Sequence, residues 1–234
     1  MSFVQLFVED RLSDSYEILA ARALGFDTAR RQQRRQGVRA AQLDINVFTT
    51  KDGMLDSVER AAKTGSRCIL FILDAEDYNR SPDRSRKLTE YCDAFEQLCR
   101  HLSALPNGDY LKQVRVACII TKSCLECWIL ADPQAIVTAF NGPSSYTPTI
   151  RNTENHDPRK ASEQIAHIIN EVGRRTQRRN LVRIKSRSIK SEGAKIAQHI
   201  DPETAAKNNT SLNRFYEMIR CEKSDCDQLS LIRT

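Results

Sequence analysis

Two groups of acidic side chains in this sequence could act together as a metal site. Each group directly follows a run of apolar residues, FVQLFV in the first case and RCILFIL in the second. Carboxylate oxygens without histidine or thiolate neighbours are the ligands that Mg2+ and Mn2+ prefer. Such an ion can activate water and stabilise the charge of a phosphoryl transition state. The acidic residues are Glu9 after the first run and Asp74, Glu76 and Asp77 after the second.

The spacing of the second group favours a shared ligand. Residues two apart in an extended segment point the same way, so Asp74 and Glu76 share a side. Like charges this close repel each other unless a cation lies between them. A second interpretation stays open, because acidic residues also occur at helix starts, where the helix dipole favours them. Asp77 could simply begin the loop before the next helix, or assist at the metal.

The elements that must position these side chains are strands alternating with helices. Strands are expected at residues 3–8, 45–48, 67–73 and 114–120, with a long helix over 83–105 between the last two. This alternation predicts a four-stranded parallel sheet with right-handed crossovers, flanked by helices. Ligands of such sheets bind beyond the carboxyl ends of the strands. If the first and third strands are neighbours, the two acidic groups meet there.

Glu126 has two possible roles at the start of a helix expected over residues 125–140. Ser123 and Glu126 match a capping box, in which the glutamate reaches back to the backbone. Glu126 also comes just after the fourth strand, where it could approach the metal. Both roles stay open. Trp128 is expected in the core.

The chain is predicted to divide near residue 142. A glycine–proline pair at 142–143 indicates a linker, and no strong strand pattern follows it. We therefore expect an α/β domain over residues 1–142 and a helical, basic C-terminal region over residues 143–234. Helices are expected in that region around 158–179, 189–200 and 204–220.

Basic residues are concentrated in two stretches of a chain whose net charge is +6. The stretches are 22–39 and 174–195, and clusters of this kind attract polyanions. Arginine also suits protein interfaces, so a protein partner is the alternative. The candidates for binding nucleic acid or a partner are Arg34, Arg35, Arg174, Arg175, Arg178, Arg179 and Lys190.

Composition argues against several classes of protein. No run of 18 apolar residues suggests a membrane span, and the first 20 residues lack the plan of a signal peptide, so a cytoplasmic protein is expected. The eight cysteines include one isolated C-x-x-C pair, so most are expected to be reduced and free of zinc. A glycine-rich phosphate loop is missing, which disfavours ATP binding by a P-loop.

The first 122 residues resemble the TOPRIM fold of topoisomerases, primases and several nucleases. Glu9 matches the glutamate that this family places after its first strand. Asp74 and Glu76 match the Asp-x-Asp after its third strand, with Glu in place of the second Asp. Asp10 stands where the family usually has glycine. The resemblance implies a parallel four-stranded sheet and a Mg2+ site.

Four short motifs are similar to those of a TOPRIM-like family of uncharacterised bacterial proteins. Members of that family are often encoded beside an ABC- or AAA-type ATPase and are suspected in anti-phage defence. Ser188 stands where members often carry an aromatic residue. The motifs are ECWILADP at 126–133, VEDRLSD at 8–14 and, more weakly, KSEGAKIAQHI at 190–200 and SLNRFYEMI at 211–219.

The leading expectation is a nuclease that acts on DNA or RNA with Mg2+ or Mn2+, as the effector of a defence system with a partner ATPase. The alternative is a non-enzymatic subunit or sensor docked on an ATPase, and a third is an RNA-binding protein that uses its C-terminal helices alone. An oligomer is possible. Glu9, Asp74, Glu76 and Glu126 are the catalytic candidates, and Glu9, Asp74, Glu76 and Asp77 are the metal-binding candidates.

Overall fold

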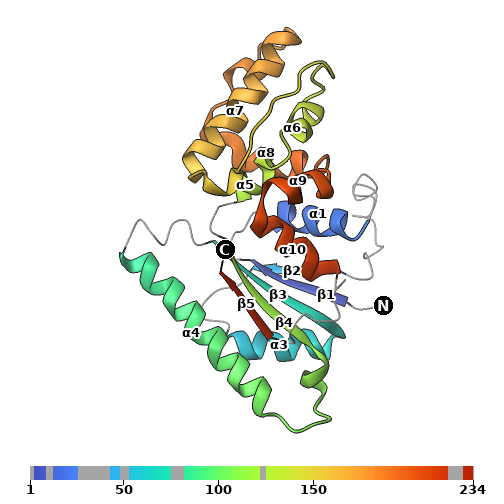
Figure 1. The fold of residues 1–234 in the computed structure, drawn as a ribbon, viewed down its shortest axis with the longest axis vertical. Coiled ribbons are helices and arrows are strands. Elements are labelled where there is room, and N and C mark those ends of the chain that lie inside the picture. The colour runs from blue at the N-terminus through green and yellow to red at the C-terminus, as the bar shows by residue number, and fades with distance from the viewer. Residues whose placement is uncertain are drawn as a thin grey trace. The chain divides into compact units, whose positions relative to one another are not determined.

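The computed structural model describes residues 3–8, 13–25, 43–47, 53–74, 82–121, 125–220 and 229–233. Its described strands form one five-stranded parallel sheet in the order β2-β1-β3-β4-β5 (Figure 1). The strands are β1 (Phe3–Val8), β2 (Leu43–Val47), β3 (Ser66–Asp74), β4 (Arg115–Thr121) and β5 (Leu229–Arg233).

The parallel sheet flanked by helices is confirmed, but the expected number of four strands is wrong. The fifth strand, β5, comes from the C-terminal region, which was expected to be helical throughout. It pairs with β4 from Val116–Leu229 to Ile120–Arg233. Five residues carry too little alternation to predict a strand by themselves. Pairing along β4 supplies the stabilisation that the local pattern does not show.

The β3 strand is the centre of the sheet because its sequence is an unbroken apolar run. Residues Cys68 to Leu73 are all at most 2% exposed, as expected for a parallel strand covered on both faces. Side chains on one face pack against α3 (Met54–Lys63) and α4 (Pro82–Ala104). Figure 1 shows these two helices on the same side of the sheet. Between α4 and β4 the chain forms the 3-10 turn η4 (Tyr110–Gln113).

The contacts divide the chain into two compact units that are discontinuous in sequence. The sheet unit comprises residues 1–13, 33–122 and 217–234, and the helical unit comprises 14–32 and 123–216. This division does not follow the expected boundary at residue 142, because the segment after β4 joins the later helices. Trp128 explains why: it is fully buried there against Tyr16 and Phe215, with ring centroids 5.8 and 4.9 Å away.

Short helices make up most of the helical unit. In chain order they are α1 (Ser13–Ala23), α5 (Leu125–Leu130), α6 (Pro133–Ala139), η5 (Thr153–Asn155), α7 (Pro158–Arg175), η6 (Leu181–Arg183), η7 (Ser186–Ser188), α8 (Ile189–Ala197), α9 (Pro202–Asn208) and α10 (Thr210–Arg220). Within the described part of the chain, no helix is long and apolar enough to cross a membrane.

Three of these helices begin with the same Asp-Pro pair. The side chains of Asp132, Asp157 and Asp201 cap α6, α7 and α9, each accepting a hydrogen bond from a backbone N–H three residues on. Proline at the first helical position loses no hydrogen bond, and its fixed φ suits the helix.

Two segments that were each expected to form one helix instead form two consecutive helices. The helix expected over 125–140 breaks at Asp132-Pro133, because proline cannot continue the ladder and aspartate caps a new helix. The helix expected over 204–220 divides into α9 and α10 at Asn209. Asn209 Oδ1 accepts the Leu212 N–H at 3.0 Å, which begins the second helix.

Candidate metal and nucleic-acid site

The order of the strands creates a switch point between β1 and β3. From β1 the chain moves to β2 on one side, and it then returns to form β3 on the other side. The crevice beyond the carboxyl ends of two such strands is where ligands of open α/β sheets bind. Val8, the last residue of β1, is the register partner of Ile72, and Asp74 ends β3 two residues later.

The predicted acidic residues follow these strand ends in sequence. Asp74 is the last residue of β3 and the register partner of Thr121 at the end of β4. Glu9, Glu76 and Asp77 lie outside the described residues, so their role as ligands remains a prediction. Among the residues that are described, no three His, Cys, Asp or Glu side chains are grouped as a metal site.

Glu126 is a nearly buried carboxylate on α5, only 4% exposed. Within the described ranges its side chain has no hydrogen bond or ion pair. The other half of its expected capping box, Ser123, lies outside the described residues. Burying a charged group without a partner is unfavourable unless another function requires it. A buried carboxylate therefore needs a partner, but the Ser123 backbone that a cap would use is not described, so both roles of Glu126 stay open.

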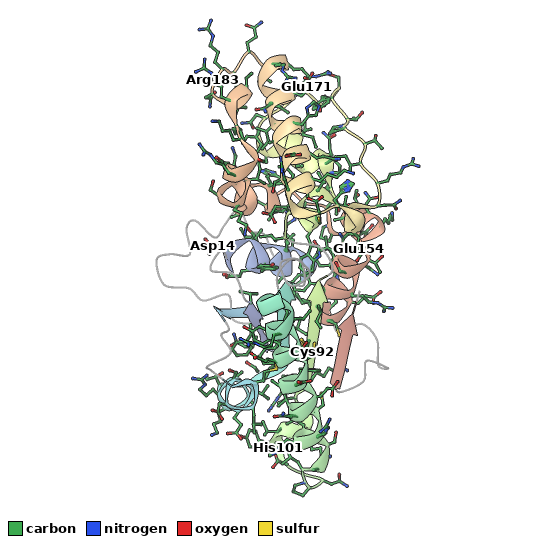
Figure 2. All side chains as sticks on the ribbon, turned by 90° about the vertical axis from the view of Figure 1, so that its left-hand side faces the viewer. Asp14, Cys92, His101, Glu154, Glu171 and Arg183 are labelled. Atoms are coloured by element: carbon green, nitrogen blue, oxygen red, sulfur yellow. The ribbon has the colours of Figure 1, made fainter. Side chains whose placement is uncertain are left out.

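Two of the predicted binding arginines form ion pairs inside the helical unit. Glu171 on α7 accepts hydrogen bonds from Arg174 at 2.5 Å and from Arg175 at 2.8 Å. Figure 2 shows Glu171 toward the end of the helical unit where Arg183 also lies. The Arg175 guanidinium also lies 4.4 Å from the centre of the Tyr146 ring. These two hydrogen bonds hold the pKa of Glu171 below its usual range.

A third predicted binding residue, Arg178, stabilises the end of another helix. Its Nη1 donates to the backbone carbonyl of Phe140, the C-cap of α6, at 3.1 Å. Cations at a helix C-terminus interact favourably with the helix dipole and with the last carbonyls. The same phenylalanine also contacts Lys195, whose Nζ lies 3.9 Å from the centre of the Phe140 ring. The side chain of Arg178 is therefore occupied by an intramolecular contact.

A different set of cations is available to a ligand. These residues are exposed, and none of their side chains has a hydrogen bond or ion pair within the described ranges. Only the first of them is among the residues selected from the sequence, although all belong to the predicted basic stretch. The missed signal is the lack of any acidic residue between Glu171 and Glu192. The set comprises Arg179, Arg183, Lys185 and Arg187.

The remaining predicted residues divide between the described and undescribed parts. Lys190 is exposed on α8. Arg34 and Arg35 lie outside the described residues, so their binding role stays a prediction.

The described cysteines are free thiols: Cys68, Cys92, Cys99, Cys118 and Cys127. Burial, with Cys92 and Cys99 nearby, strongly raises the pKa of the Cys118 thiol. A thiol in that state is a poor nucleophile. Cys118 therefore belongs to the core rather than to a reactive site. Cys124, Cys221 and Cys226 lie outside the described residues.

Comparison with known proteins identifies one family. The family described as Domain of unknown function (DUF4276) matches residues 12–220. Neither the curated proteins nor the solved structures contain a match.

Proposed function

Starting from the premise that this chain belongs to the DUF4276 family, we propose that it is a divalent-metal-dependent nuclease with a TOPRIM-like site at the carboxyl ends of β1 and β3. The observation that carries the proposal is the strand order. It makes β1 and β3 neighbours at the switch point, with Glu9 and Asp74 at or directly after their carboxyl ends. The match between this arrangement and the expected acidic pattern supports a shared ligand.

The donor set suits a hard cation. Glu9, Asp74 and Glu76 offer carboxylate oxygens, with Asp77 as a further candidate, and this chemistry favours Mg2+ or Mn2+. When bound, such an ion supplies an activated water and stabilises the charge of the phosphoryl group. In this proposal the carboxylates lie at or after the ends of two adjacent strands in the sequence, and Glu9 is either a metal ligand or the general base that accepts a proton from the water. Glu126, buried and unpaired among the described residues, is the additional candidate in this role.

The substrate class follows from the basic surface of the helical unit. Its arginines and lysines would hold the phosphate backbone of DNA or RNA, which sets position without sequence preference. The resemblance to defence-associated TOPRIM-like proteins adds a partner ATPase to the proposal. We propose no membrane partner.

A second function is supported by the sequence at the site itself. Glu76 stands in place of the second Asp of the family pattern, and Asp10 in place of glycine. Both changes suit a subunit or sensor that docks on an ATPase without cutting nucleic acid. An active chain in the presence of Mg2+, without any partner, would contradict this alternative.

The test uses Glu9→Gln and Asp74→Asn. Each variant removes one charge from a repelling cluster, so the metal-free protein should melt at the same temperature as the wild type or higher. Mg2+ should raise the melting temperature of the wild type by more than it raises that of either variant. Cleavage by the variants should fall by about a hundredfold or more, because an ion contributes several kcal/mol of charge stabilisation. Asp93→Asn on the exposed side of α4 is the matched control.

Equal stabilisation by Mg2+ in the wild type, both variants and the control, with unchanged cleavage, would contradict the metal site. Glu126 is tested alongside with two substitutions. Glutamine keeps the cap of a capping box, so Glu126→Gln should lose cleavage only if the carboxylate acts in the site. A cap role instead predicts that Glu126→Ala lowers stability by about 1 kcal/mol while cleavage by both variants is unchanged.

A further inference from the structure

The chain after α7 is held against that helix at an unusually close distance. A Cβ atom added at Gly173 would lie 2.8 Å from both the Leu181 Cβ and the Val182 backbone nitrogen. The Leu181 side chain is buried, and Asn170 Nδ2 donates to the Ile184 carbonyl at 3.2 Å. Glycine at position 173 therefore lets residues 181–184 pack directly on the helix. The backbone of this segment is fixed, although the side chains of Val182 and Arg183 are exposed.

The end of α7 sets the direction of the segment. Gln177 has a left-handed φ of 58°, and the Arg178 N–H donates to the Gly173 carbonyl at 2.8 Å. This is the bonding pattern of a Schellman cap, which reverses the chain at a helix C-terminus. After the reversal Arg178 contacts the end of α6, and the residues that follow return along α7.

The arginines of this region therefore form two sets with different chemistry. In the first set Arg174 and Arg175 pair with Glu171, and Arg178 bonds to Phe140. The side chains of the second set are exposed and have no partner among the described residues. We name this set the basic track, and it consists of Arg179, Arg183, Lys185 and Arg187.

We infer that the basic track binds the phosphodiester backbone of the nucleic acid on which the proposed nuclease acts. This inference rests on the proposed function for the identity of the substrate. A backbone that is already fixed loses little further freedom on binding, and each of the four cations can release counterions from a phosphate. Arg174, Arg175 and Arg178 are not part of the binding surface, because their guanidinium groups already have partners.

The chemistry favours nucleic acid over the other polyanions. An anionic membrane surface would need apolar side chains to insert, and Val182 is the only large apolar residue that the described structure exposes in this segment. A protein partner would need a buried aromatic or apolar anchor, which the track lacks. Phosphates repeated along a backbone match charges spread along a segment.

The test compares two variants with the same change of charge. One carries Arg179→Gln, Arg183→Gln, Lys185→Gln and Arg187→Gln. The control carries Arg60→Gln, Lys63→Gln, Arg86→Gln and Arg100→Gln, all on the exposed sides of α3 and α4. Binding is measured by fluorescence anisotropy with a labelled DNA duplex and with an RNA strand of the same length. EDTA is present, so the measurement does not depend on cleavage.

We expect the track variant to bind about a hundredfold more weakly at moderate salt, and its slope of log K against log salt to be less steep by roughly 3 to 4. The control should stay close to the wild type. Unchanged binding by the track variant, or an equal loss in the control, would overturn the inference. Binding to vesicles of phosphatidylglycerol and phosphatidylcholine that depends on the track, without binding to nucleic acid, would also overturn it.

The same experiment separates the inference from the proposed function. If the track variant loses binding while Glu9→Gln binds and cleaves like the wild type, the nuclease site is wrong and the track is supported. If Glu9→Gln loses cleavage while the track variant binds normally, the track is wrong and the nuclease site is supported. Circular dichroism and thermal melting confirm that each variant folds.

Discussion

The two units of this protein use polar side chains in opposite ways. In the described part of the sheet unit the buried polar residues are Gln5, Ser57 and Ser66, whereas both buried acidic residues, Glu126 and Asp132, lie in the helical unit. The sheet unit depends on apolar contacts between the faces of the sheet around β3 and the helices α3 and α4. The helical unit connects short helices through side chains that bond to helix ends. Helices this short are unstable alone, so their ends must be tied to neighbours.

The largest expected effect tests the apolar half of this comparison. Phe71 is fully buried in β3, and its ring stacks on Phe7 with centroids 5.0 Å apart. Phe71→Ala should lower the free energy of unfolding by about 3–5 kcal/mol, through lost transfer energy and the cavity left behind. Urea denaturation measures it, with Phe71→Leu as the control that fills most of the space. If Phe71→Ala loses no more unfolding free energy than Phe71→Leu, the sheet core can close around the space that the ring leaves.

A smaller effect tests the polar half. Asp132 accepts the Ala135 N–H at 3.2 Å and the Asp201 N–H at 2.8 Å, so one carboxylate caps α6 and also joins it to the start of α9. Asp132→Ala should cost about 2–4 kcal/mol, because it leaves two donors unsatisfied in a buried place. Asp157→Ala removes an exposed cap of the same Asp-Pro type and should cost about 1 kcal/mol. Equal losses in the two variants would show that burial does not matter at these caps.

The smallest expected effect on stability concerns Glu171, a partly exposed residue whose carboxylate pairs with Arg174 and Arg175. Hydrogen bonds from Arg175 and Arg174 lower its pKa in the folded state, so its contribution is present above the pKa of the unfolded chain. That contribution is lost as pH falls through the lower pKa of the folded state. Glu171→Gln should therefore change the melting temperature little under acid conditions and lower it slightly at neutral pH.

The same substitution sharpens the distinction between the two sets of arginines. Without the carboxylate, Arg174 and Arg175 become available to phosphates, and affinity for nucleic acid should rise a few-fold with a steeper salt dependence. Glu163→Gln, which removes the exposed pair with Arg159 near the start of α7, is the control. Unchanged affinity in Glu171→Gln would mean that the paired arginines lie away from the bound backbone.

Much of the sheet unit could be predicted from sequence, because its elements carry strong local patterns. The run from Cys68 to Leu73 indicates a buried central strand, and the spacing of apolar residues from Leu88 to Leu102 indicates α4. The strand β5 could not be predicted, since its stability comes from β4 and not from its own five residues. The division of the helix expected over 125–140 could have been predicted from Asp132-Pro133. The apolar periodicity that continues across this pair indicated a single helix instead.

The acidic residues of the candidate site can be selected from the sequence, but the arrangement of the strands that precede them cannot. An acidic residue after a strand is visible in the sequence, whereas the position of β1 beside β3 depends on strand order. The arginines show the same limit. The pairing of Glu171 with Arg175 follows from helical spacing, but the bond from Arg178 to the Phe140 carbonyl joins residues 38 apart. Sequence alone therefore cannot separate an arginine that supports the fold from one that is available to a ligand.

The position of β5 has a consequence for the order of events during synthesis. The helical unit is complete in sequence at residue 216, whereas the sheet unit still needs residues 229–233 to cover the β4 edge. On the ribosome the edge of β4 therefore remains unpaired while more than a hundred later residues are made and the helices assemble. An unpaired edge is a template for association with other chains, and long-range parallel pairing is slow. Translation speed through the last segment should thus influence how much of the newly made protein escapes aggregation.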